Sequence, residues 1–188
     1  MTTIRIELPT WLDSAVAEAG TLEDDEHRVG LAIDLARRNV AEGTGGPFAT
    51  LIVRESSGEI VAAGVNVVVP SSTAIAHGET TAIAAAGQQS GTFDLGAAGR
   101  TGLYTSTEPC LMCLGATVWS GVSRLVIGAR DADAAAVGFD EGPKPEAWVD
   151  QLTARGIEVV QDVRRPEAAQ VLLDYLAGGG LIYNAERT

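Results

Sequence analysis

His77-Gly78-Glu79 and Pro109-Cys110-Leu111-Met112-Cys113 are the two stretches that decide how this chain of 188 residues folds. One imidazole and two thiolates can hold a zinc ion and leave its fourth tetrahedral position open, which is typical of catalytic zinc sites. Glu79 can stand beside the open position without binding the metal. The pattern predicts a catalytic zinc site, one Zn2+ per chain, with His77, Cys110 and Cys113 as ligands.

Composition excludes several kinds of partner. The net charge is −12, and the longest basic clusters are Arg37-Arg38 and Arg164-Arg165. A nucleic-acid-binding protein needs a basic surface, so we expect a small substrate and no nucleic-acid partner. No apolar run approaches the roughly 20 residues of a membrane span, and the N-terminus lacks the pattern of a signal peptide. Because the only two cysteines lie in the motif, we expect a reduced, cytoplasmic protein without a membrane partner.

The pattern of apolar and turn residues predicts a layered α/β domain. A hairpin comes first, and helices and strands alternate after it, which favours a mixed sheet of about five strands between helices. We expect one domain over residues 1–188, with an N-terminal extension (1–22) and a C-terminal lid segment (178–188). The expected strands are 48–54, 59–65, 103–106, 124–129 and 157–161. The expected helices are 23–42, 77–87, 110–120, 131–137, 144–155 and 166–176.

Both halves of the motif begin helices in this interpretation. The positive potential of a helix N-terminus favours thiolates, and cysteines three residues apart share one helical face. Zinc lowers the pKa of its bound water to about 7, which supplies a hydroxide nucleophile. Glu79 would accept that proton, pass it to a ring nitrogen of the substrate, and then protonate the departing amine. The expected reaction is hydrolysis of an exocyclic amino group with release of ammonia.

Each motif residue also has a plainer interpretation when taken alone. His77 would be a surface or capping residue, Glu79 a carboxylate in a first helical turn, and the cysteines small buried apolar residues or a redox pair. Their order and spacing together favour zinc catalysis. The pattern H-x-E followed by P-C-x-x-C is the signature of the zinc-dependent base deaminases.

The chain resembles the cytidine-deaminase-like superfamily, and within it the small guanine deaminases, from about Val29 to the C-terminus. One departure is Gly78, where that family usually has alanine. The resemblance implies a three-layer fold and a dimer, for which the apolar segment 116–119 is a candidate surface. The stretches that carry the resemblance are Gly46-Pro47-Phe48-Ala49, Asn66, Thr105-Ser106-Thr107-Glu108-Pro109-Cys110, Leu114-Gly115-Ala116, Val137-Gly138-Phe139-Asp140-Glu141-Gly142 and Leu181-Ile182-Tyr183-Asn184.

The resemblance also implies substrate-binding roles. Glu141 would contact the purine and act with Glu79 as a second catalytic carboxylate, and Asn66 would bind the base. Glu141 suits guanine because the N1–H and 2-amino groups both donate hydrogen bonds. As plainer alternatives, Glu141 would be a solvated loop charge and Asn66 a turn residue.

Four further residues are candidates for the walls of the base pocket. Phe48 and Ala49 would form one wall, with Phe48 or Trp119 covering a face of the base. Tyr183 lies in the segment that closes over the pocket. As alternatives, Phe48 and Trp119 would belong to the core or to an interface.

The expected function is deamination of guanine to xanthine in purine metabolism. Three alternatives stay open at this point. The first is deamination of another small amino-heterocycle or nucleoside, such as cytosine, guanosine or ammeline. The second is a tRNA adenosine deaminase, against which the negative charge argues. The third is a noncatalytic zinc-binding module, against which Glu79 argues.

Overall fold

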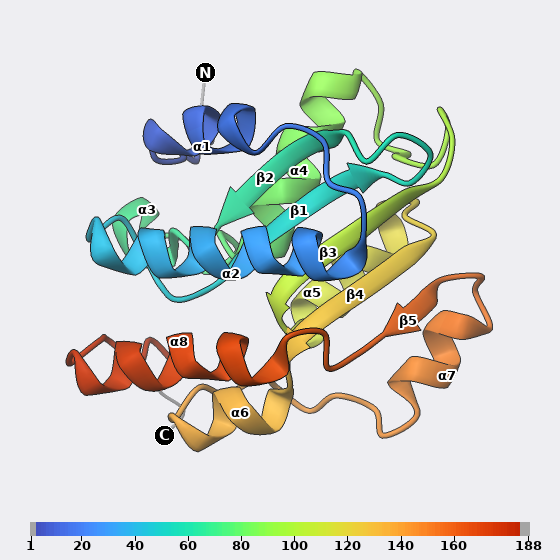
Figure 1. Cartoon of the computed structure of the whole chain (residues 1–188). Helices are drawn as coiled ribbons and strands as arrows, with labels where there is room; N and C mark the ends of the chain where they lie inside the picture. The colour runs from blue at the N-terminus through green and yellow to red at the C-terminus, as the bar shows by residue number, and fades with distance from the viewer. Residues whose placement is uncertain (1–2, 185–188) are drawn as a thin grey trace.

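The computed structural model describes residues 3–184 and shows a five-stranded sheet between two layers of helices (Figure 1). The strands are β1 (Ala49–Arg54), β2 (Ile60–Val65), β3 (Thr101–Thr107), β4 (Arg124–Ala129) and β5 (Glu158–Val160), in the order β2-β1-β3-β4-β5. Strand β1 is antiparallel to both of its neighbours, whereas β3, β4 and β5 are parallel. Strands β2 and β3 therefore end at the same edge of the sheet. The predicted mixed sheet of about five strands is confirmed.

Helices cover both faces of the sheet. One face packs against α1 (Trp11–Ala19), α2 (Asp25–Ala41), α6 (Asp131–Ala136) and α8 (Arg165–Ala177). The other face packs against α4 (Gly78–Ser90), α5 (Leu111–Trp119) and α7 (Trp148–Thr153). A single turn, α3 (Val68–Ser71), follows β2. Within residues 3–184, no helix has the length and apolar character needed to cross a membrane.

Three local predictions differ from the structure. Helix α7 begins at Trp148 and not at residue 144, because Lys144 precedes Pro145 and a residue before proline avoids the helical region. Helices α1 and α3 were not expected from the sequence. Leu12 of α1 is buried in the same core as α2 and α8, so this part of the N-terminal extension packs with the rest of the fold. The other element ends differ from the expected ones by up to three residues.

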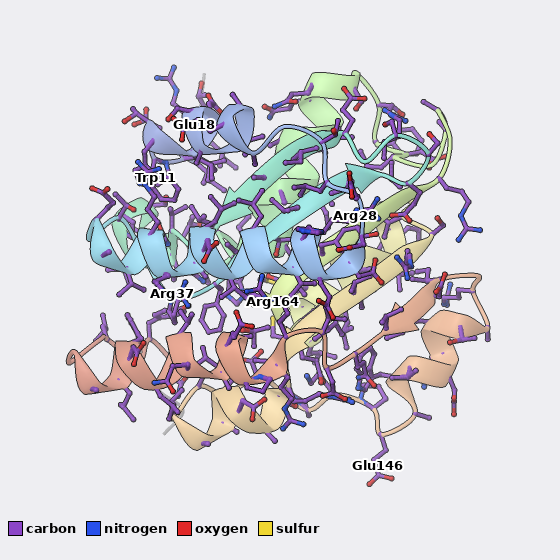
Figure 2. The ribbon with its side chains drawn as sticks, in the orientation of Figure 1. Trp11, Glu18, Arg28, Arg37, Glu146 and Arg164 are labelled. Carbon is purple, nitrogen blue, oxygen red and sulfur yellow. The ribbon has the colours of Figure 1, made fainter. Side chains whose placement is uncertain are left out.

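A buried polar cluster holds α2 against the edge of the sheet that lies opposite the motif. Arg28 (labelled on α2 in Figure 2) donates to the Tyr104 hydroxyl at 2.5 Å, and this hydroxyl donates to Glu55 at 2.7 Å. Arg124 of β4 donates to both carboxylate oxygens of Asp25 at 2.5 and 2.8 Å. Burial raises the pKa of Tyr104 to about 12, so its hydroxyl keeps its proton and the donated bond at neutral pH.

The backbone of α4 lies directly against β2, and a glycine makes this approach possible. A Cβ atom on Gly64 would lie 2.3 Å from the Ala82 nitrogen and 2.4 Å from the Gly78 oxygen, both backbone atoms of α4. Neither atom can move aside without moving the helix. The absence of a side chain at Gly64 therefore sets how closely α4 packs against β2.

We predict that Gly64→Ala destabilises the protein by about 1–3 kcal/mol, as overpacked core positions do. The control is Gln89→Ala, at an exposed position near the end of α4. This substitution should change stability by about 0.5 kcal/mol or less, as surface substitutions usually do. Urea unfolding measures both variants. An unchanged unfolding midpoint for Gly64→Ala would contradict the close packing.

Candidate active site

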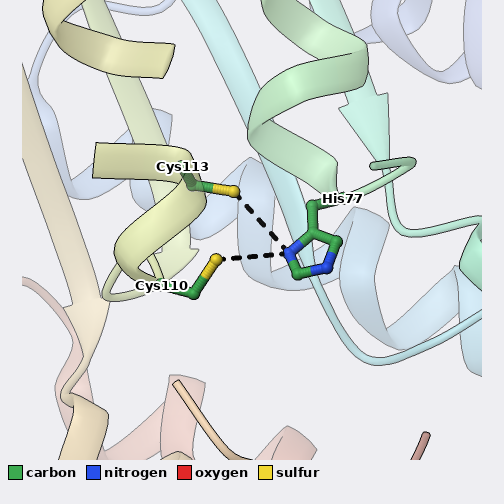
Figure 3. Close-up of side chains that lie close together, drawn as sticks. All are labelled: His77, Cys110 and Cys113. Carbon is green, nitrogen blue, oxygen red and sulfur yellow. Dashed lines mark hydrogen bonds between the residues drawn. The ribbon is translucent and has the colours of Figure 1, made fainter. Parts of the chain in front are cut away.

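His77, Cys110 and Cys113 converge on one point (Figure 3). The His77 Nδ1 atom lies 3.6 Å from each cysteine sulfur. Zinc bonds of about 2.1 Å to nitrogen and 2.3 Å to sulfur place tetrahedral ligand atoms about 3.6 Å apart, so these side chains fit a zinc ion without rearrangement. With three protein ligands, the fourth position is free for a water or substrate.

The ends of β2 and β3 bring the three ligands together. His77 is the N-cap of α4, which follows β2, and Cys110 is the N-cap of α5, which follows β3. Both cap residues have extended backbone, so the helices begin one residue later than the sequence predicted. Cys113 is fully buried in the first turn of α5. A hydrogen bond from the Cys113 thiol lowers the pKa of Cys110 to about 4, and His77 adds to this effect.

A cavity of about 480 Å³ opens beside the ligands. Its wall includes His77, Glu79 and Cys110 from the motif. Glu79 is buried in the first turn of α4. Burial raises the pKa of Glu79, and the negative charge of Cys110 adds to the rise. A carboxyl group with a raised pKa beside a metal position can both accept and return a proton near neutral pH.

Glu141 and Tyr183 line the same cavity, as does Phe48. The Glu141 backbone oxygen accepts a hydrogen bond from the Leu111 nitrogen at 3.0 Å, which ties its loop to the start of α5. Burial raises the pKa of Glu141 to about 8, and the charges of Cys110 and Glu79 contribute. A zinc ion at the ligands would favour the ionised carboxylate.

Two unpaired polar atoms lie beside the cavity wall. The Asn66 side-chain nitrogen and the Tyr183 hydroxyl are buried, and neither has a hydrogen-bond partner among the described residues. Both side chains adjoin Gly46, where a Cβ would lie 3.1 Å from the Asn66 Oδ1 and 3.2 Å from the Tyr183 hydroxyl. Burial raises the pKa of Tyr183, which keeps its hydroxyl protonated. Buried polar groups without a partner are costly, so these atoms are suited to bind a ligand.

The C-terminal segment lies against the Glu141 loop. The Asn184 amide donates to the Gly138 oxygen at 2.8 Å and accepts from the Asp140 nitrogen at 3.0 Å. The Tyr183 ring packs edge-on against Phe139 with centroids 5.4 Å apart. Residues 178–184 of the expected lid segment therefore include two residues of the cavity wall, Tyr183 and Asn184, whereas residues 185–188 lie outside the described part of the chain.

Two candidate residues lie away from the cavity wall in this chain. Trp119, which the sequence suggested as a cover for the base, ends α5 with 84% of its surface exposed and borders a separate apolar groove beside Trp148. Ala49 is fully buried in β1 and packs against Gly78. A Cβ atom added to Gly78 would lie 3.2 Å from the Cα atom of Ala49. Gly78 thus allows close packing at the helix start.

The sequence interpretation missed part of the cavity wall. The segment after Asn66 contributes Val68, Val69, Ser72, Thr73 and Ala74. One signal was available: residues 67–76 join the end of the hairpin to His77, and both of these positions belong to the predicted site. Glu108 also lines the cavity, and its position directly before the Pro-Cys pair was visible in the sequence.

Residues 22–129 match the family model described as the cytidine and deoxycytidylate deaminase zinc-binding region. The chain belongs to this deaminase family. The match includes both helix starts and all three zinc ligands, so the observed arrangement of these side chains fits the zinc-binding region that the family model describes. His77, Cys110 and Cys113 are therefore the residues of this deaminase positioned to hold zinc.

Individual deaminases resemble this chain to different extents. Guanine deaminase from Bacillus subtilis is 43% identical over 110 residues, which cover 58% of this chain and 67% of that protein. A tRNA-specific adenosine deaminase from Haemophilus influenzae is 31% identical over a region that covers 80% of this chain and 82% of that protein. Among solved structures, guanine deaminase from Nitrosomonas europaea superposes with a TM-score of 0.89 at 44% identity, covering 93% of this chain and 97% of its own.

We predict that the purified deaminase contains one zinc per chain and that Cys110→Ala loses most of it, because two protein ligands hold zinc poorly. Elemental analysis after dialysis measures the metal. Gln88→Ala, at an exposed position near the end of α4 opposite to His77, is the control and should keep full zinc. Full zinc in Cys110→Ala would contradict the ligand assignment.

Proposed function

We propose that this chain hydrolyses guanine to xanthine and ammonia in a zinc-dependent reaction. The observation that carries the proposal is the half-buried carboxylate of Glu141 in the wall of the cavity that also contains Glu79, His77 and Cys110. The N1–H and 2-amino groups of guanine form an edge of two donors, which a carboxylate can accept through charge-assisted hydrogen bonds. The similarity to guanine deaminases from two bacteria supports the same substrate.

Other parts of the cavity suit the rest of a purine. The Asn66 amide nitrogen and the Tyr183 hydroxyl have free donor capacity, which matches the ring-nitrogen and carbonyl acceptors of guanine. Phe48 and Phe139 line the cavity and pack together with ring centroids 4.9 Å apart, which provides an apolar surface for the face of the base. A related structure, NE0047 with bound 2,6-diaminopurine, has a TM-score of 0.91 at 44% identity and covers 97% of this chain.

Glu79 carries the protons in the proposed reaction. When bound at the three ligands, zinc supplies a water activated as a nucleophile near neutral pH. Glu79 accepts one proton of the attacking water and transfers it to a ring nitrogen of guanine. It then takes the second water proton from the new C2 hydroxyl and delivers it to the amino group as the C2–N bond breaks, which leaves the C2 carbonyl of xanthine. One water is consumed and one ammonia is released.

We predict that Glu79→Gln lowers kcat by about 10²–10⁴-fold and keeps its zinc, since an amide of the same shape cannot carry the proton. Ammonia release from guanine and elemental analysis measure the two quantities. Glu7→Gln, a substitution in the exposed N-terminal segment, is the control. A loss smaller than about tenfold would mean that another group carries the proton.

We predict that Glu141→Gln lowers kcat/KM for guanine by about 10–100-fold, since a buried site loses about 1–3 kcal/mol when one hydrogen-bonding partner is mismatched. Ammonia release from guanine measures this loss. The same assay with cytosine, adenine, guanosine and ammeline shows which substrate reacts fastest. If cytosine reacts much faster than guanine and Glu141→Gln changes neither, the guanine assignment is wrong and zinc-dependent deamination alone remains.

We also propose that residues 1–188 act as one domain that pairs into a homodimer in a reducing compartment such as the cytoplasm, within purine metabolism. The two thiolates of the zinc site support the reducing environment. One face of α5 supports the dimer, since Leu111, Met112, Gly115 and Trp119 are all exposed there and recur at helical spacing. Thr117 of the expected apolar segment is buried and does not belong to this face.

We predict that light scattering at micromolar concentration gives the mass of a dimer and that Trp119→Glu shifts the equilibrium toward the monomer. A buried charge at the centre of an apolar contact opposes association. Phe93→Glu, at an exposed loop residue outside α5, is the comparison variant. A monomer in the unmodified protein would contradict the proposed assembly.

A further inference from the structure

Lys144 is the only lysine among the 13 lysine and arginine residues of this chain. It is also one of the least exposed basic side chains, with 5% of its side-chain surface accessible. Most of the arginines form ion pairs near the surface. The one position occupied by a lysine therefore has a different environment from the rest.

The Lys144 ammonium group contacts three acceptors. Its nitrogen lies 2.7 Å from the Glu108 carboxylate, 3.3 Å from the Pro109 carbonyl oxygen and 3.1 Å from the Asp131 carboxylate. Glu108 is itself buried and lines the cavity. An ammonium has three N–H donors, so the three acceptors use its full capacity.

Lysine suits this position better than arginine. Two acceptors belong to the adjacent residues Glu108 and Pro109, which follow β3, and the third lies at the start of α6, so they approach the nitrogen from two segments. A compact ammonium can donate in three directions, whereas the planar guanidinium fork pairs best with one flat partner. The geometry therefore accounts for a lysine in a chain that otherwise uses arginine.

The backbone around Lys144 connects it to Glu141. The Lys144 nitrogen donates to the Gly142 oxygen at 2.9 Å, and the Glu141 oxygen accepts from the Leu111 nitrogen at 3.0 Å. Two bonds thus tie residues 141–144 to the residues on both sides of Cys110, one at Pro109 and one at Leu111. These bonds link the backbone of the Glu141 loop to the residues that flank a zinc ligand.

We propose that Lys144 is a positioning residue for Glu141: by pairing with Glu108 beside Cys110, it sets the distance between the carboxylate that selects guanine and the zinc ligands. The inference rests on the proposed function, because it assigns to Glu141 the contact with the donor edge of the base. Lys144 itself does not touch the substrate. Without the Lys144 side chain, only the hydrogen bond from the Leu111 nitrogen to the Glu141 oxygen would hold the Glu141 loop on α5.

A double-mutant cycle with Lys144→Met and Glu141→Gln tests the inference through kcat and KM for guanine and through zinc content. We expect Lys144→Met to raise KM and lower kcat/KM by about tenfold or more, within the range of coupling between groups in contact. In the Glu141→Gln background the same change should cost less than about threefold. The control is Glu146→Gln, an exposed residue of the same loop that points away from the protein (Figure 2), which should leave both parameters unchanged.

Several results would overturn the inference. Additive effects of the two substitutions, or a loss confined to kcat with unchanged KM, would mean that Lys144 only supports the fold. Loss of zinc in Lys144→Met would mean that it acts on the metal ligands. If the unmodified protein releases no ammonia from guanine, the proposed function itself fails, and this inference fails with it.

A measurement on the unmodified protein covers the case in which Lys144→Met does not fold. Because the chain has one lysine, ¹³C-lysine labelling gives a single set of side-chain NMR signals. Addition of 8-azaguanine, which is bound in structures of NE0047 variants, should shift the Lys144 Cε signal through Glu108 and the Glu141 loop. An unchanged Cε signal at saturation would overturn the inference.

Discussion

The convergence of one imidazole and two thiols on a single point is the constraint on which the rest of the structure depends. It requires two helices to begin within a few ångströms of each other. Strands β2 and β3 satisfy this because they run in the same direction and each is followed by a helix on the same face of the sheet. In such α/β units, helix N-termini gather at the carboxyl edge of the strands, where ligands bind. Gly64 then lets α4 lie close enough to β2 for His77 to reach the cysteines.

The site concentrates negative charge at this edge. Glu79, Glu108 and Glu141 all line one cavity next to two cysteines. Burial raises the pKa of Glu79 and of Glu141 because it disfavours their ionised forms. Nearby cations reduce this unfavourable free energy. Zinc supplies positive charge on one side, and Lys144 supplies it on the other by pairing with Glu108. The acidic net charge of the chain is consistent with this arrangement, since a small base needs no basic surface to reach the cavity.

Local patterns were sufficient for most elements because strand alternation and helical spacing act over a few residues. They failed where a neighbouring residue or a distant contact decided the outcome. Pro145 excludes helix at Lys144, and the short helix α1 depends on packing Leu12 into the core of α2 and α8. The position of Trp119 could not be predicted either. Its place near the motif in sequence suggested the pocket, but two helical turns separate it from Cys113 and direct it to the surface.

The sequence by itself determined the zinc ligands, the carboxylate of Glu79 close to them and the mixed sheet, because these follow from residue types and spacing. Only the tertiary structure decided which other residues meet that chemistry. The family resemblance suggested Asn66, Glu141 and Tyr183, but these residues come from segments far apart in the chain. Their approach depends on strand order and on the contacts of the C-terminal segment with the Glu141 loop. The physical reason is the distance along the chain over which each pattern acts. Residue spacing encodes the geometry of a single helix or strand, whereas a cavity forms by packing between several such elements.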